Sequence, residues 1–198
     1  MNREKNPAVL PEGYQELFHI DLQKDRKLMM LVNGIGLGLF VAFALLGHFA
    51  FVPVTAMFDM EQGFGMYALR FAVMIAGLVV YLVLHEAVHG VCMWFFSGVK
   101  PSFGFNGMYA WAGSTAYYSK VPYLIIALAP IVVWGVVLAV ICAVVPPAWL
   151  WVPYFIQVAN LSGAAGDLYV TARFRKLPDT ILVNDTGVAM TVYDRPRQ

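Results

Sequence analysis

The chain has 198 residues, of which 60% are hydrophobic and only 13% are charged, and its formal net charge is +1. Because soluble domains carry about 25% charged residues, this composition excludes an ordinary soluble domain and indicates a membrane protein that contacts the lipid bilayer. No stretch has the basic and aromatic pattern of a nucleic-acid surface, so we expect no nucleic-acid partner. Cys92 and Cys142 fall in apolar segments and fit packing better than a disulfide or a C-x-x-C metal site.

The first 27 residues are polar and charged and are predicted to form a cytosolic tail. The apolar run after them is too long for the hydrophobic part of a cleavable signal peptide, so we expect none. Residues 28–58 contain no Asp, Glu, Lys or Arg. Since a membrane-spanning helix needs roughly 20 apolar residues, the first span is predicted at about 28–52.

The second span is predicted at about 68–97, where Glu86 is the only formally charged residue between Arg70 and Lys100. Residues 98–120 follow, in which aromatic and small residues alternate around Asn106-Gly107. Asn-Gly is the strongest short signal for a tight hairpin turn, so this stretch is predicted to be a β-hairpin-like insert.

Residues 121–166 contain no charged residue and are interrupted by Pro146-Pro147. They predict a third span at about 121–145 and a fourth at about 148–172. The remaining residues, 173–198, are predicted to be an irregular or partly strand-like cytosolic tail. The expected fold is thus an all-α membrane protein with a four-span domain at 28–172 and a small hairpin-like insert between the second and third helices.

Lysine and arginine residues are distributed very unevenly between the two sides of this predicted topology. Four spans place both tails and the 98–120 insert on one side, which then carries 12 of the 13 Lys and Arg residues. The opposite side carries only Arg70. Because positively charged loops stay in the cytosol, both termini are predicted to be cytosolic.

The second span contains the pattern His85-Glu86-x-x-His89. On a helix, positions i and i+4 lie on one face, so both imidazoles can reach one metal ion. Glu86 can then hold a metal-bound water and take its proton. Each ionisable side chain in mid-bilayer costs about 2.5–3.5 kcal/mol on insertion scales, so three of them in five residues indicate function. A zinc site is favoured over a proton or ion pathway.

Catalytic zinc takes three protein ligands, and the remaining histidines are poorly placed, because His19 is in the tail and His48 is near the non-cytosolic end of the first span. Asp167 is the only charged residue in the fourth span. It lies 6 residues before Arg173, roughly 9 Å, and His89 lies 8 residues before Ser97, roughly 12 Å, so both have similar depth. Pairing of Asp167 with Arg173 or Lys176 at the helix end is the alternative.

Asn160 precedes Asp167 by seven residues and shares a helix face with Gly163 and Asp167. It is a candidate to hydrogen-bond a substrate backbone or the water of the site. A polar contact between two helices explains an asparagine at this position equally well.

The sequence HEAVHG in one span, and an aspartate preceded by an asparagine in a later one, resemble the site-2 protease type of intramembrane zinc metallopeptidase. More closely, the chain resembles a small bacterial membrane family described as putative zincin peptidases of unknown function. That resemblance covers the HE-x-x-H span, the hairpin-like insert, N-x-x-G-x-x-G-D and the tail segment LPDTILVNDTG. It implies His85, His89 and Asp167 as zinc ligands, Glu86 as catalytic base, and a bacterial inner membrane. Site-2 proteases usually place this aspartate in an L-D-G context, whereas this chain has Gly166-Asp167-Leu168.

The expected function is hydrolysis of peptide bonds in a membrane protein or peptide substrate by a zinc-activated water, with Glu86 as the base. The edge of the 98–120 insert is a candidate to pair with an unwound substrate. It also fits a membrane-surface hairpin anchored by aromatic residues. Those anchors would be Tyr109, Trp111, Tyr117 and Tyr118. The alternative function is a non-catalytic metal-binding transporter or sensor, which the scarcity of polar residues in the first and third spans disfavours. The oligomeric state is not defined by the sequence.

Overall fold

The computed structural model describes residues 6–105, 107 and 109–196. The chain forms two compact units. Unit one comprises Met1–Leu31, His85–Pro130 and Asp167–Gln198. Unit two comprises Val32–Leu84 and Ile131–Gly166.

Within the described residues, three helices are long and apolar enough to cross a membrane: α1 (Arg26–Ala50), α2 (Phe64–Ser97) and α3 (Lys120–Val144). They coincide with the first three predicted spans and support the prediction of a membrane protein. Their long uncharged runs explain the agreement, because nothing in them favours a turn or exposure to water. Short 3₁₀ turns, η1 (Val54–Phe58) and η2 (Pro147–Trp149), lie in the connections.

The predicted fourth span is divided into two shorter helices, α4 (Trp151–Gly163) and α5 (Ala165–Phe174). The helix is interrupted at Ala164, whose backbone angles are φ −83° and ψ 19°. Gly163 and Gly166 flank the interruption, and glycine weakens a helix by about 1 kcal/mol relative to alanine. Since α4 has 13 residues and α5 has 10, neither alone reaches the length of a span, and the count of four spans stays a prediction.

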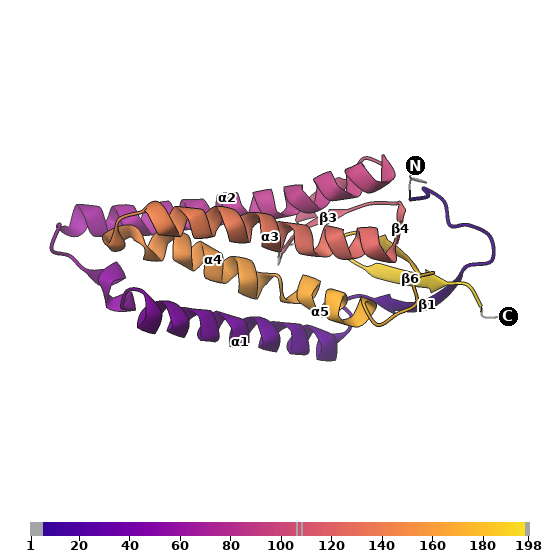
Figure 1. Ribbon diagram of the computed structural model, residues 1–198, viewed down its shortest axis with the longest axis horizontal. Helices are drawn as coiled ribbons and strands as arrows, with labels where there is room; N and C mark the ends of the chain where they lie inside the picture. The colour runs from indigo at the N-terminus through magenta and orange to yellow at the C-terminus, as the bar shows by residue number, and fades with distance from the viewer. Residues whose placement is uncertain (1–5, 106, 108, 197–198) are drawn as a thin grey trace. The chain divides into compact units, whose positions relative to one another are not determined.

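Unit two consists mainly of helical segments from α1, α2, α3 and α4 (Figure 1). Aromatic residues of α4 fix the connection after α1, because Trp151 donates its indole N–H to the carbonyl of Val52 and the Tyr154 hydroxyl donates to that of Phe43. The side chain of Arg70 is buried and donates to the Asp59 carbonyl and the Gln62 side chain. These contacts close the loop between α1 and α2.

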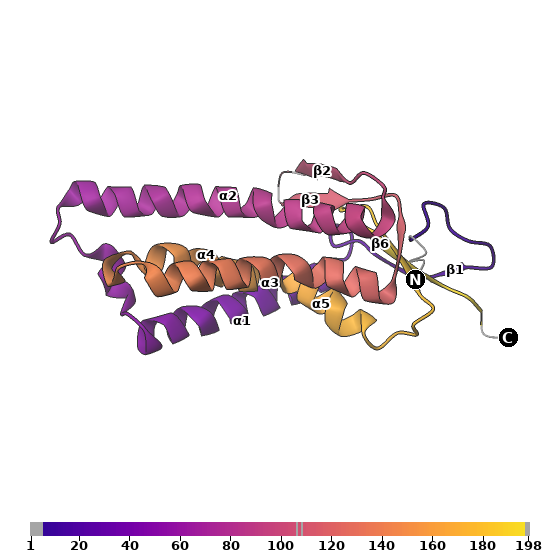
Figure 2. The same cartoon turned by 45° about the horizontal axis from the view of Figure 1, so that its top comes forward.

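Unit one contains two antiparallel sheets, which Figure 2 shows near the ends of the chain and beside α2. The larger has the order β1-β6-β5-β4. Its strands are β1 (Gln15–Ile20), β4 (Tyr117–Ser119), β5 (Leu182–Asp185) and β6 (Met190–Asp194). The all-α fold class is therefore too narrow: β1 in the N-terminal tail was not predicted, whereas β5 and β6 agree with the prediction of a partly strand-like C-terminal tail. Residues from both tails pair directly, as in Gln15 with Asp194, and complete a sheet that neither tail forms alone.

The second sheet is the predicted hairpin and joins β2 (Ser102–Phe105) to β3 (Ala110–Gly113). Asn106, half of its turn signal, lies outside the described residues. The proposed aromatic anchors do not share one environment. Tyr118 is fully buried and donates its hydroxyl hydrogen to the Met93 carbonyl, so it is not a membrane-surface anchor.

The core of unit one lies where the four-stranded sheet meets helical segments of α2, α3 and α5. Tyr123 and Ile126 of α3, Phe174 of α5 and Val183 and Val192 of the sheet are at most 2% exposed. This apolar layer fixes the beginning of α3 against the sheet. It therefore fixes the helices that carry the ionisable residues.

Candidate metal site

Helix α2 places His85 and His89 on one face, as their spacing predicts. Their ring centroids are 5.0 Å apart, and the two residues are only 8% and 9% exposed. Two imidazoles packed this closely in an apolar helix are poorly solvated. Their nitrogens therefore need partners supplied by the protein or by a ligand.

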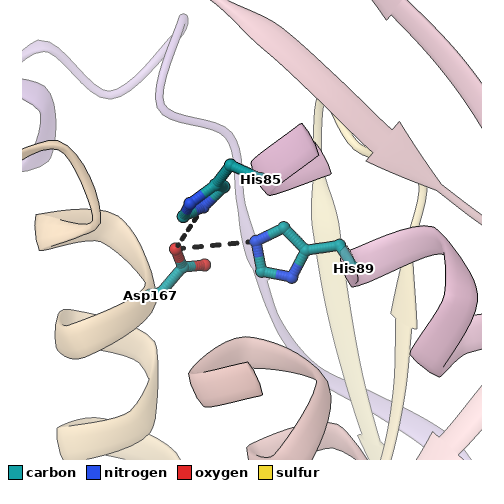
Figure 3. A group of neighbouring side chains, drawn as sticks. All are labelled: His85, His89 and Asp167. Carbon is teal, nitrogen blue, oxygen red and sulfur yellow. Dashed lines mark ion pairs between the residues drawn. The ribbon is translucent and has the colours of Figure 1, made fainter. Parts of the chain in front are cut away.

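Asp167 is in the first turn of α5 and points toward both histidines (Figure 3). Its Oδ2 is 3.7 Å from Nε2 of His85 and 3.7 Å from Nε2 of His89. The interruption at Ala164 makes Asp167 a first-turn residue, where the positive end of the helix dipole favours a carboxylate. The structure thus brings together the three predicted ligands, all three ligand atoms lying within 4.8 Å of one another.

This spacing fits a zinc ion. Tetrahedral ligands at roughly 2.0–2.2 Å from zinc are about 3.4 Å from one another. The two nitrogen–oxygen separations of 3.7 Å need only a few tenths of an ångström of closure, and all three ligand atoms lie within 4.8 Å of one another. Two imidazoles and one carboxylate are also a donor set that catalytic zinc sites use, with a fourth position left for water.

A backbone carbonyl orients His89. Nδ1 of His89 lies 2.9 Å from the carbonyl oxygen of Ile126 in α3. Because a carbonyl can only accept, Nδ1 carries the hydrogen, and in the neutral ring Nε2 then has its lone pair on the side of Asp167. Ligating histidines in metalloproteins are fixed in the same way.

Glu86 is next to the hairpin. It follows His85 in α2, and the backbone N–H of Ala112 in β3 lies near its carboxylate. This N–H is available to orient the carboxylate beside the histidine pair. The same proximity brings strand β3 to the residue that is predicted to act as the base.

A second, half-buried carboxyl group lies near the site and was not predicted. Asp185 in β5 accepts hydrogen bonds from the Tyr123 hydroxyl, at 2.7 Å, and from the backbone N–H of Gly187. Burial raises the pKa of Asp185, whereas these two bonds favour its charged form. The carboxyl group also interacts electrostatically with His89 and Asp167, and so adds to an environment that attracts cations. Its place in LPDTILVNDTG was the available signal.

The other candidate residues have other partners. His19 is hydrogen-bonded to Thr191, and His48 accepts a hydrogen bond from the backbone N–H of Val54. Arg173, the alternative partner of Asp167, lies 4.1 Å over the ring of Phe18.

Asn160 is completely buried within unit two. Its side-chain oxygen accepts a hydrogen bond from the Tyr81 hydroxyl, and its amide donates to the carbonyl of Ile131. These bonds connect α4 to α2 and α3, which is the interhelical contact given above as an alternative. A role for Asn160 toward substrate stays a prediction.

The sequence matches the model of a protein family described as "Putative zincin peptidase". The match covers residues 78–182, which are 105 of the 198 residues and include His85, Glu86, His89 and Asp167. No curated protein and no solved structure matches the chain. Since the matched segment spans more than half of the sequence, the chain belongs to the putative zincin peptidase family.

Proposed function

We propose that this protein is an intramembrane zinc metallopeptidase that hydrolyses peptide bonds of membrane-associated proteins. The observation that carries the proposal is the convergence of Nε2 of His85, Nε2 of His89 and Oδ2 of Asp167, with both nitrogen–oxygen distances at 3.7 Å. Membership of a zincin peptidase family supports zinc and peptide hydrolysis. The apolar helices α1, α2 and α3 support a site inside a membrane protein.

A zinc ion held by His85, His89 and Asp167 would supply a Lewis acid for the scissile carbonyl and lower the pKa of a bound water toward about 7. Glu86 takes a proton from the attacking water and delivers it to the leaving amine. The backbone N–H of Ala112 lies near the Glu86 carboxylate and is available to orient it during this transfer.

The substrate is proposed to bind as an extended segment beside the hairpin. A peptide bond inside a helix is shielded by its own hydrogen bonds, so a membrane helix must unwind locally before hydrolysis. Strand addition satisfies the backbone groups that are then exposed, which lipid cannot do. The contact between Ala112 of β3 and Glu86 supports this arrangement, because it puts a strand next to the base.

The topology is proposed to follow the charge distribution, with four spans in a bacterial inner membrane and both termini in the cytosol. The positive-inside bias of the sequence supports this orientation. Asp167 precedes Arg173 by six residues, so a site at this depth is within reach of cytosolic water.

Glu86→Gln tests the proposed activity. The substitution keeps an acceptor for Ala112 and removes the base, so we expect cleavage of single-span reporter proteins in liposomes to fall about 10²–10⁴-fold. Bound zinc should be unchanged, because Glu86 is not a ligand. Asp59→Asn, which removes a carboxylate from the loop before α2, is the matched control and should leave both quantities unchanged. Full zinc with no cleavage by the wild type would favour the non-catalytic alternative.

A further inference from the structure

The carbonyl group of Ile126 cannot accept the usual i+4 hydrogen bond of an α-helix. In an α-helix this oxygen accepts a hydrogen bond from the N–H four residues later. Position 130 is a proline inside α3, and proline has no N–H. The Ile126 carbonyl instead accepts the hydrogen bond from Nδ1 of His89, at 2.9 Å.

This bond lies where water cannot replace it. Ile126 is 1% exposed, Pro130 is fully buried and His89 is 9% exposed. A buried carbonyl without a donor is unfavourable, so the protein gains from keeping Nδ1 of His89 protonated and directed at α3. The same ring orientation leaves Nε2 on the side of Asp167.

We propose that Pro130 is a positioning residue of the metal site. Because proline has no N–H, the Ile126 carbonyl is available to set the tautomer and ring orientation of His89. This inference rests on the proposed metal site. It assigns to a proline in an apolar helix a role toward a ligand that is more than thirty positions away in the sequence.

The start of α3 is held by contacts that do not involve Pro130. Tyr123 donates to Asp185 at 2.7 Å, and its ring centroid is 5.6 Å from that of Phe174. The Lys120 ammonium donates to the Leu177 carbonyl, at 2.6 Å. Replacement of Pro130 by alanine should therefore leave this part of α3 in place. The change adds one backbone donor that competes with His89 for the Ile126 carbonyl.

The test is Pro130→Ala in the full chain. We expect zinc affinity, measured by competition with a chelator, to fall about 10- to 100-fold, as it does when other partners of ligating histidines are lost. The visible absorption spectrum of the cobalt-loaded protein should change as well. The melting temperature should not fall, because proline is unfavourable inside a helix. If the role of Pro130 were purely structural, Pro130→Ala would lower the melting temperature and leave the zinc affinity and the cobalt spectrum unchanged.

Pro153→Ala is the matched control. Pro153 is in the first turn of α4, where a backbone N–H has no helical partner, so its replacement frees or blocks no carbonyl within that helix. We expect wild-type zinc affinity and an unchanged cobalt spectrum. Equal zinc affinities and spectra for wild type, Pro130→Ala and Pro153→Ala would overturn the role of Pro130 while leaving the metal site intact. A wild type that binds no zinc would overturn the site itself.

A second measurement does not depend on the folding of the variant. Nitrogen-15 NMR of the zinc-loaded wild type should show His89 with a protonated Nδ1 and an unprotonated Nε2. The chain has four histidines, so single His→Gln variants suffice for the assignment. A protonated Nε2 at His89 would overturn the inference.

Discussion

Two groups of polar side chains in the apolar helices, one around Asn160 and one around Asp167, differ in their contacts. They differ in whether their members form hydrogen bonds of ordinary length with one another. In unit two, Asn160 accepts from the Tyr81 hydroxyl at 3.1 Å and donates to the Ile131 carbonyl at 3.2 Å. In unit one, the two histidine Nε2 atoms are each 3.7 Å from the same oxygen of Asp167. That separation is longer than an ordinary hydrogen bond of 2.7–3.2 Å.

The difference separates a structural contact from a ligand site. Both groups are costly to place in lipid, so polarity alone does not distinguish them. The bonds of Asn160 are directed at other protein groups and fasten helices together. The candidate ligand atoms of His85, His89 and Asp167 lie within 4.8 Å of one another, which leaves them able to hold one ion between them. The proximity of ligand atoms, rather than the presence of polar residues, is what makes His85, His89 and Asp167 the candidate metal site.

The largest contrast should come from one alanine substitution in each group. His89→Ala removes a zinc ligand, so zinc affinity should fall at least about 100-fold, at the upper end of what loss of an outer partner causes. Asn160→Ala should leave zinc affinity unchanged and lower the free energy of unfolding by about 1–2 kcal/mol, because Tyr81 and Ile131 lose their partner. Zinc titration and denaturant unfolding in detergent measure the two effects. Loss of zinc in Asn160→Ala would contradict a purely structural role for Asn160.

A smaller effect is expected for Tyr81→Phe. The substitution removes the hydroxyl that donates to Asn160 and keeps the ring packed against Trp134. Hydrogen bonds between membrane helices contribute about 0.6 kcal/mol on average, so the free energy of unfolding should fall by about this amount. Zinc content and reporter cleavage serve as internal controls and should match the wild type. A drop in cleavage greater than the loss of stability would contradict a purely structural role for this pair.

The smallest effect is expected for Gly135→Ala. A Cβ atom at this position would lie 3.7 Å from Nδ2 of Asn160, which is an ordinary van der Waals contact. The helix gains propensity from the change, so stability should shift by less than about 1 kcal/mol in the favourable direction. Thermal unfolding measures the shift. A clear decrease would mean that α3 and α4 tolerate no added methyl group beside Asn160.

The helices and the grouping of His85, His89 and Asp167 were predictable because their signals are local or depend on depth. Uncharged apolar runs predict α1, α2 and α3, and the i, i+4 spacing puts His85 and His89 on one face. Asp167 was found because an acid in a span is rare and its depth resembles that of His89. The interruption at Ala164 was missed, although Gly163 and Gly166 flank it.

The sheet of the two tails could not be predicted in the same way. Strands β1 and β6 are short, and their pairing joins Gln15 to Asp194 across nearly the whole sequence. Local alternation of residues does not identify such a partner. The contact between His89 and Ile126 involves a backbone carbonyl and so has no side-chain signal. Pro130, four residues after Ile126, is the sequence feature that indicates an available carbonyl at Ile126.

The central claim is that His85, His89 and Asp167 hold one zinc ion, and the zinc content of the purified protein tests it most directly. Elemental analysis of the wild type should find about one zinc per chain, and Asp167→Ala should lose it. Asp179→Ala is the matched control, since this exposed carboxylate pairs with Lys120, and it should retain the metal. A zinc-free wild type after growth and purification with zinc present would contradict the claim. Equal zinc in Asp167→Ala and the wild type would remove Asp167 from the site.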